Sequence, residues 1–295
     1  MVLTILNLFL YFGGIDMKLV NYTYKGITQI GVFKDHLLYP TEFENLYDLM
    51  DKYDVESLDK LKLGSPVRLE NVSYNAIIKY PKADILCAGM NYYEHKKECL
   101  DAKIDYSNEI KSVYFSKRCS EAKTSGDVID LHLDLTKEPD YEGELGVILG
   151  KDIYKANKKT AFDAIFGYTV INDISARDLQ KDHQQFYFGK SLDGYTSIAP
   201  ILVTRDEFVG YPNLELKTYV NNELRQHNYT SNMIFSIEDM LLELTRGITL
   251  KKGTIISTGT PSGIGKGFNP PKLLKPGDEV LIQIEGVGDL YNTFK

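Results

Sequence analysis

The sequence predicts an α+β fold that is rich in β-strands, with a small α+β domain before a larger one. Apolar and polar residues alternate across 17–40 with a break at Lys25-Gly26, which is typical of a small β-hairpin region. Across 41–63 the apolar residues have helical spacing, with acidic residues in the first turn. From Lys82 onward short strands alternate with short helices. A chain of 295 residues can bury a large core in this way.

The first sixteen residues are expected to form an extension outside the fold. Their apolar run is shorter than the roughly 20 residues that a membrane-spanning helix needs. No Lys or Arg precedes Lys18, so the basic region of a secretory signal is missing. Met17 opens the first alternating segment and is an alternative start of the protein. The expected divisions are therefore an extension over residues 1–16, a small N-terminal domain over 17–80 and a larger domain over 81–295.

The charge and cysteine content exclude several classes of partner. The net charge is −7, from 34 Lys and Arg against 41 Asp and Glu. This balance argues against a general nucleic-acid binder or a binder of anionic membranes. Cys87, Cys99 and Cys119 form neither a CxxC pair nor an even disulfide set, which indicates a reducing cytoplasm. We therefore expect a cytoplasmic protein without nucleic-acid or membrane partners.

Two glutamates stand two positions apart in the stretch from Asp140 to Leu149, which has the composition of a strand. Side chains on a strand alternate between its faces, so Glu142 and Glu144 share a face with Ile148, whose apolar character indicates burial. Two like charges near a core are costly unless a cation lies between them. A hard divalent cation bound through oxygens fits this requirement. A half-exposed strand with a solvated acidic edge is the alternative.

A third carboxylate ends the next β-branched strand. Residues 167–173 run from Gly167 to Asp173, and strand ends on rigid scaffolds are common positions for catalytic groups. If this strand lies beside the acidic one, Asp173 converges with Glu142 and Glu144. Arg177 and Lys190 follow soon after and could neutralise surplus carboxylate or hold an anionic substrate. Each could equally form an ordinary surface ion pair.

A histidine and a glutamate follow the apolar strand that ends at Gly89. If a helical turn starts at Tyr93, His95 and Glu98 lie on one side of it at positions i and i+3. A carboxylate beside an imidazole can orient it and support its cationic form, as in a general-base pair. The alternative is an exposed helix among lysines.

Two other segments have informative patterns. Residues 129–135 alternate strictly and are expected to form a strand. Residues 253–265 form a strand that enters a glycine-rich loop. The loop lacks the Lys-Ser/Thr ending of a P-loop and does not fit GxGxxG, so nucleotide binding has little support. Such a loop can instead bring Thr260 and backbone N–H groups to a small ligand.

Taken together in this order, the motifs resemble the fumarylacetoacetate hydrolase family across most of residues 81–293. Each motif is weak alone, but all of them in register make the resemblance specific. The residues that carry it are 89–92, His95 with Glu98, 141–145, 167–173 with 175–178, 189–191 and 258–263.

The resemblance implies a roll of mixed β-sheets, usually a homodimer, with a 2-oxo acid as substrate. It also implies Mg²⁺ or Mn²⁺ as the cofactor. The metal ligands it implies are Glu142, Glu144 and Asp173; the catalytic residues are His95, Glu98 and Lys190; and the substrate-binding residues are Arg177, Gln180 and Thr260.

For the activity, the resemblance implies hydrolysis of a C–C bond in acylpyruvate-like β-diketo acids, releasing pyruvate and a carboxylic acid. The presence of both His95 and Glu98 favours hydrolysis, because this pair could activate water. One alternative is decarboxylation of oxaloacetate, or isomerisation or hydration of unsaturated 2-oxo dicarboxylic acids, at the same metal site. Another is a non-catalytic metabolite-binding protein. The short N-terminal domain favours the bacterial-type members over the eukaryotic namesake.

Overall fold

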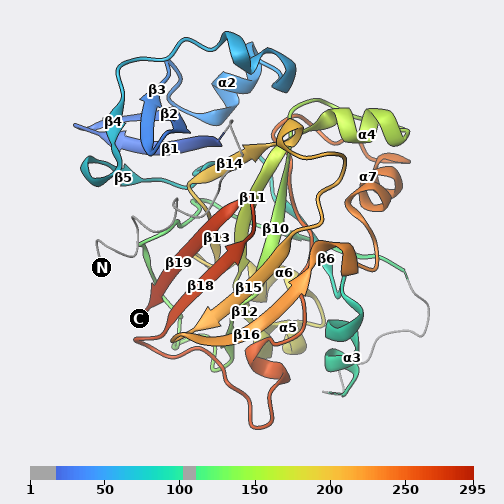
Figure 1. Ribbon diagram of the computed structural model, residues 1–295. Helices are drawn as coiled ribbons and strands as arrows, with labels where there is room; N and C mark the ends of the chain where they lie inside the picture. Colours follow the sequence, from blue (N-terminus) through green and yellow to red (C-terminus); the bar gives the residue numbers. More distant parts are fainter. Residues whose placement is uncertain (1–17, 102–110) are drawn as a thin grey trace.

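β-Strands dominate the computed structural model, which describes residues 18–101 and 111–295 (Figure 1). The α+β, strand-rich class predicted from the sequence is confirmed. The expectation for residues 1–16 lies outside the described residues. Among the helices that the structure describes, none is long and apolar enough to cross a membrane.

The largest sheet has twelve strands, most of them antiparallel. Its strands are β1 (Lys18–Tyr24), β2 (Ile27–Lys34), β3 (Leu37–Pro40), β4 (Val67–Arg68), β5 (Ser73–Tyr74), β6 (Ile85–Gly89), β7 (Val113–Lys117), β10 (Gly143–Leu149), β11 (Ile165–Asp173), β13 (Thr196–Ile198), β14 (Ile201–Thr204) and β17 (Ile255–Ser257). Their order is β4-β3-β2-β1-β14-β11-β10-β17-β6-β7, with β5 on β1 and β13 on β11. Strands β17 and β6 run parallel.

A second sheet of five strands packs against the first. It contains β8 (Val128–Ile129), β15 (Glu215–Val220), β16 (Glu223–Tyr229), β18 (Glu279–Ile284) and β19 (Gly288–Phe294), in the order β16-β15-β18-β19-β8. The short strands β9 (Pro139–Asp140) and β12 (Ser175–Ala176) pair separately. Asn221 and Asn222 adopt positive φ between β15 and β16, as expected for a turn built on asparagines.

The helices are short and connect the strands. They are α2 (Leu46–Lys52), α3 (Tyr93–Asp101), α4 (Lys158–Ala164), α5 (Arg177–His183), α6 (Phe186–Lys190) and α7 (Ile237–Thr245), with 3-10 helices at Val55–Lys60, Leu69–Asn71, Arg205–Glu207, Thr230–Asn232 and Gly265–Gly267. The helical spacing across 41–63 therefore yields α2 and a separate 3-10 helix. The break occurs because Tyr53 and Asp54 are extended, and Asp54 exchanges hydrogen bonds with Ser57 to start the second helix.

The strands before residue 80 continue the large sheet. Strand β1 pairs with β14 in the register Lys18↔Val203, Leu19↔Leu202 and Val20↔Ile201. Figure 1 shows β1 to β5 and α2 together at one end of the molecule, beside β14. The division into domains at residue 80 stays a prediction.

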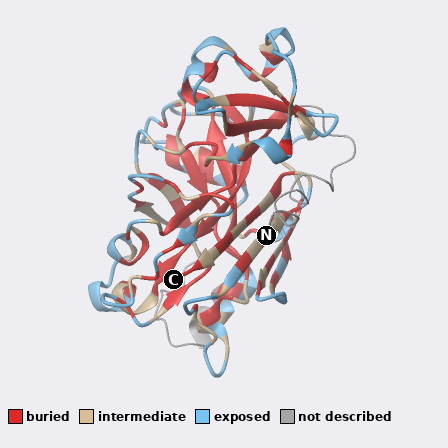
Figure 2. Ribbon diagram, turned by 90° about the vertical axis from the view of Figure 1, so that its left-hand side faces the viewer, coloured by how far each residue is buried: buried red, intermediate tan, exposed pale blue. Residues whose placement is uncertain are grey.

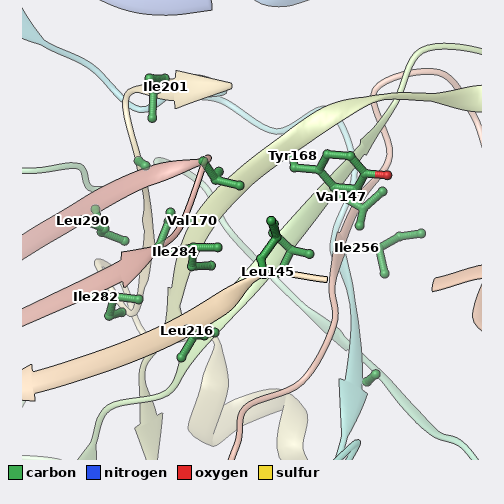
Figure 3. Close-up of a cluster of buried hydrophobic side chains, with 14 of the residues drawn as sticks. Leu145, Val147, Tyr168, Val170, Ile201, Leu216, Ile256, Ile282, Ile284 and Leu290 are labelled. Carbon is green, nitrogen blue, oxygen red and sulfur yellow. The ribbon is translucent and has the colours of Figure 1, made fainter. Parts of the chain in front are cut away.

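Alternation along β10 separates two hydrophobic clusters. Leu145 and Val147 face the second sheet, where they lie with Leu216, Ile282 and Ile284 (Figure 3). The opposite face of β10 carries Ile148, which belongs to a second cluster. In Figure 2 the buried residues follow the strands of both sheets, and exposed residues gather in the connecting segments. Glu144 points to the same face as Ile148 and is therefore enclosed by protein.

The alternation across 129–135 does not form the expected strand. Strand β8 ends at Ile129, and His132 adopts φ 51° in the left-handed region. The His132 N–H donates to Asp130 Oδ1 at 2.9 Å, and the His132 carbonyl accepts from Leu135 N at 2.8 Å. These local bonds form a turn, because aspartate offers the backbone an alternative to a sheet ladder.

Candidate active site

Three carboxylates converge where β10 meets β11. The two strands are antiparallel neighbours with Gly143 opposite Asn172, and Asp173 N donates to the Glu142 carbonyl at 2.9 Å. Carboxylate oxygens of Glu142, Glu144 and Asp173 all lie within 4.8 Å of one another. The three residues are 5%, 2% and 1% exposed. The predicted convergence is confirmed, and the alternative of a solvated acidic edge is wrong.

Two of the predicted cations contact this cluster. Lys190, at the end of α6, places its Nζ 2.5 Å from both Glu142 Oε2 and Asp173 Oδ2. Arg177 begins α5, and its Nη1 lies 2.6 Å from Glu142 Oε1. The Lys190 side chain is 4% exposed and that of Arg177 is 11% exposed. Neither forms an ordinary surface ion pair.

A third cation, Lys117, was not identified from the sequence. Its Nζ lies 2.5 Å from Asp173 Oδ1 and also donates to the carbonyls of Ile174 and Tyr195, at 3.1 and 2.7 Å. All three ammonium hydrogens therefore have acceptors. The only sequence signal was a lysine at the end of the apolar strand β7.

Glu144 differs from its neighbours because its bonds come from neutral donors. Its Oε2 accepts from Ser257 Oγ at 2.5 Å and from Gly259 N at 2.9 Å. Burial, and then the charges of Asp173 and Glu142, raise the pKa of Glu144 to about 8. Burial acts in the same direction on Glu142, but Lys190, Arg177 and His95 outweigh it and lower the pKa of Glu142 to about 2. Without a bound cation, Glu144 therefore retains its proton at neutral pH, whereas Glu142 is ionised.

The donor set fits a divalent cation. The triad and the buried Asp140, which lies 2.9 Å from Arg177 Nε, place four carboxyl groups beside three cations, an excess of one negative charge when all four are ionised. A divalent cation would convert this excess to one positive charge, which suits an anionic substrate. Mg²⁺ prefers oxygen ligands in octahedral geometry, and three carboxylates leave positions for other oxygens.

The predicted His95–Glu98 pair is present on α3. His95 is 4% exposed, and its Nδ1 lies 3.0 Å from Glu98 Oε2. Glu98 Oε1 accepts from Gly263 N at 3.1 Å. Asn91 fixes the start of the helix, because its amide donates to the Thr258 carbonyl at 2.8 Å and bonds Phe235. The alternative of an exposed histidine on a solvated helix is wrong.

The predicted substrate-binding residues differ in the hydrogen-bond donors that they can still offer to a ligand. Arg177 Nη2 is buried and has no hydrogen-bond partner among the described residues. Gln180 Oε1 lies 3.4 Å from Arg177 Nη1. The Thr260 hydroxyl donates to the Gly143 carbonyl at 3.0 Å and accepts from Gln226 Nε2 at 2.8 Å. Since its hydrogen is already used, Thr260 has its backbone N–H as the donor to offer.

Gln226 is a second residue that the sequence did not reveal. It is 0% exposed on β16, and its Oε1 accepts from Gly143 N at 3.1 Å. It therefore joins the second sheet to the acidic strand and to Thr260. Glycine is required opposite it, because a Cβ on Gly143 would lie 2.3 Å from Thr218 Oγ1.

The strand-rich α+β fold thus encloses a carboxylate triad that could hold a metal ion, together with three cations and an oriented histidine. Residues 84–295 match the model of the fumarylacetoacetate (FAA) hydrolase C-terminal family. The chain belongs to the fumarylacetoacetate hydrolase family, as the sequence motifs indicated.

Similar proteins include enzymes with several names. The chain is 43% identical over 224 residues to oxaloacetate tautomerase YisK of Bacillus subtilis, covering 76% of this chain and 73% of the relative. The structure of a fumarylacetoacetate hydrolase from Exiguobacterium antarcticum matches with a TM-score of 0.80 at 35% identity, covering 95% and 99% of the two chains. A 2-hydroxyhepta-2,4-diene-1,7-dioate isomerase from Mycobacterium marinum matches with a TM-score of 0.72 at 25% identity, covering 94% and 98%.

Proposed function

We propose that this protein is a metal-dependent tautomerase of a short 2-oxo acid, with oxaloacetate as the first candidate substrate. The reaction moves one proton from C3 to the oxygen on C2, or back, and consumes nothing else. The observation that carries the proposal is the contact of the buried His95 with the partly buried Glu98, close enough to Glu142 for the His95 charge to lower the pKa of Glu142. The similarity to an oxaloacetate tautomerase supports the same reaction class.

The triad would hold the cofactor. A divalent cation on Glu142, Glu144 and Asp173 supplies Lewis-acid polarisation of the keto group when bound. His95 is the proposed base. In this proposal Nδ1, which faces the Glu98 carboxylate, would carry the ring hydrogen, and the imidazole would take the proton from C3. Glu98 then stabilises the imidazolium that forms, while Gly263 N holds its other oxygen.

Two cations would bind and stabilise the substrate. Burial opposes the charge of Lys190, but Asp173 and Glu142 raise its pKa, so its ammonium persists and can stabilise negative charge on the enolate oxygen. Arg177 has Nη2 left for a substrate carboxylate, since its other nitrogens already serve Asp140 and Glu142. Gln180 and the N–H of Thr260 complete the proposed set of substrate contacts.

Hydrolysis of acylpyruvates to pyruvate and a carboxylic acid is the second candidate. The same His95–Glu98 pair favours it, because an oriented imidazole can also deprotonate water. Decarboxylation and isomerisation would use the enolate-stabilising groups without water attack. The choice among these reactions therefore depends on whether His95 faces a water molecule or the substrate carbon during turnover.

We also propose Mg²⁺ or Mn²⁺ as the cofactor, a homodimer as the assembly and the cytoplasm as the location. The all-oxygen donor set supports these metals. The net charge of −7 supports the absence of nucleic-acid and anionic-membrane partners. Light scattering of the purified protein tests the dimer.

The decisive experiment follows the enol absorbance of oxaloacetate and of a series of acylpyruvates, with Mg²⁺ and with a chelator. We expect accelerated keto–enol conversion that needs the metal and is lost in His95→Gln. His227→Gln is the matched control, because His227 pairs with Glu215 at 2.8 Å on the surface and should retain full activity. Release of pyruvate from an acylpyruvate without tautomerisation would favour the second candidate, and release of pyruvate from oxaloacetate would instead indicate decarboxylation. Binding without any conversion would reject both reactions.

A further inference from the structure

One buried carboxylate, Asp140, joins the proposed substrate anchor to the glycine-rich loop. It is 0% exposed. Its Oδ1 accepts from Tyr141 N at 3.0 Å and from Gly265 N at 2.7 Å. Its Oδ2 accepts from Lys266 N at 3.0 Å and from Arg177 Nε at 2.9 Å. The position of the Arg177 guanidinium therefore depends on the same side chain that holds the turn at residues 263–267.

Helix α3 also contacts this turn, through Glu98. Glu98 Oε1 accepts from Gly263 N at 3.1 Å, and Glu98 Oε2 holds His95. Gly267 approaches Glu98 so closely that a Cβ there would lie 1.9 Å from Oε1. Carboxylates from two different elements, Glu98 and Asp140, thus accept hydrogen bonds from the same turn.

The turn is bonded internally and to neighbouring segments. Gly267 N donates to the Ile264 carbonyl at 3.0 Å, and Lys272 N donates to the Gly265 carbonyl at 2.8 Å. The Lys266 Nζ also pairs with Glu138 Oε1 at 2.6 Å. Because the turn is bonded in this way, we expect a shift at Asp140 to displace the groups that contact Glu98.

We propose that Asp140 is a positioning residue that couples anion binding at Arg177 to the seating of α3. An anion on Arg177 fixes the guanidinium, Asp140 and the turn, and thereby holds Glu98 and His95 in place. By reciprocity, a seated α3 strengthens anion binding at Arg177. The roles of Arg177 and His95 rest on the proposed function, but the coupling is measured without turnover.

The test is hydrogen exchange of residues 93–98 in the full-length protein, free and with Mg²⁺ plus oxalate as a chelating dianion. Asp140→Asn preserves size but removes the charge and one acceptor. Couplings between sites typically change an equilibrium by about 5–150-fold, and we expect about tenfold faster exchange of α3 in this variant, with the protection by oxalate reduced. Asp178→Asn is the matched control. Asp178 lies beside Arg177 and accepts from Lys137 N at 2.8 Å, but its bonds are to other segments than the turn.

Unchanged exchange of α3 in Asp140→Asn, together with weaker oxalate binding, would overturn the coupling and leave Asp140 acting on Arg177 alone. If that variant does not fold, Lys266→Met replaces it, since Lys266 and Glu138 are each 31% exposed and their ion pair ties down the same turn. It should also speed α3 exchange, and wild-type exchange there would contradict the proposal. Faster α3 exchange in a protein that converts no substrate would support the coupling while rejecting the proposed function.

Discussion

Gly267→Ala should displace the partner of the proposed base without touching the carboxylate triad. The new Cβ would lie 1.9 Å from Glu98 Oε1 and 2.2 Å from its Cδ, whereas ordinary contact begins at 3.4 Å. Gly267 does not occupy the left-handed region, so its backbone accepts alanine. The flexible carboxylate must therefore retreat by about 1.5 Å, the difference between those distances. Its bonds to His95 Nδ1 and Gly263 N, at 3.0 and 3.1 Å, cannot both survive.

A hydrogen bond to a charged group contributes about 1.5–3 kcal/mol, and each 1.4 kcal/mol on a barrier is about tenfold in rate. We therefore expect kcat to fall about 10- to 100-fold, measured as steady-state enol conversion with Mg²⁺. Gly247→Ala is the control, because a Cβ there would meet nothing within 4 Å. Equal kcat in the two variants would refute the role assigned to Glu98.

Three other perturbations test the cluster and a separate buried acid. Mg²⁺ at a hundred times its dissociation constant should stabilise the protein by about 2.7 kcal/mol, seen as a higher Tm. Glu144→Gln should remove most of this rise, and an equal rise would contradict the ligand assignment. Lys117→Met should lower the free energy of unfolding, measured in urea, by about 3–5 kcal/mol, because Asp173 Oδ1 loses its buried partner. A loss under about 1 kcal/mol would count against a structural role for this pair. Burial raises the pKa of Asp289 to about 6 despite a bond from Gln283 at 2.8 Å. The folded carboxyl thus keeps its proton to higher pH than the unfolded one, so its contribution to stability is greatest below about pH 4 and is lost as the pH rises through 6. Asp289→Asn should raise Tm at pH 7 but not at pH 4, and equal shifts at both values would argue against this titration.

The alternation of apolar and polar residues predicted a strand correctly where the segment pairs with neighbouring strands in the fold. The alternation before Lys25 and after Gly26 became β1 and β2, and the acidic stretch became β10, although Tyr141 and Glu142 interrupt the expected strand before it. The pattern across 129–135 failed because alternation says nothing about φ, and His132 adopts the left-handed conformation. A short polar side chain can redirect the backbone without changing the apolar period.

The convergence of the three carboxylates could be predicted because Glu142 and Glu144 stand two positions apart in an extended segment and Asp173 ends the next strand. Lys117, Asp140 and Gln226 could not, since their importance comes from contacts between distant segments. Lys117 meets Asp173 across 56 positions, and Gln226 meets Gly143 across 83. No local signal distinguishes such residues from ordinary strand positions. Substrate binding by Thr260 stays a prediction, and its hydroxyl is engaged within the protein.

The pairing of β1 with β14 has a practical consequence for attempts to isolate the family-matching part. Strand β14 lies between β1 and β11, and its residues from Ile201 to Thr204 are all buried. A shortened protein starting at residue 81 would leave one edge of this apolar strand with unpaired N–H and C=O groups. Such an edge recruits strands from other molecules, so the shortened protein should aggregate. Since β11 ends at Asp173, fraying of that edge would also loosen the strand that carries one carboxylate of the triad.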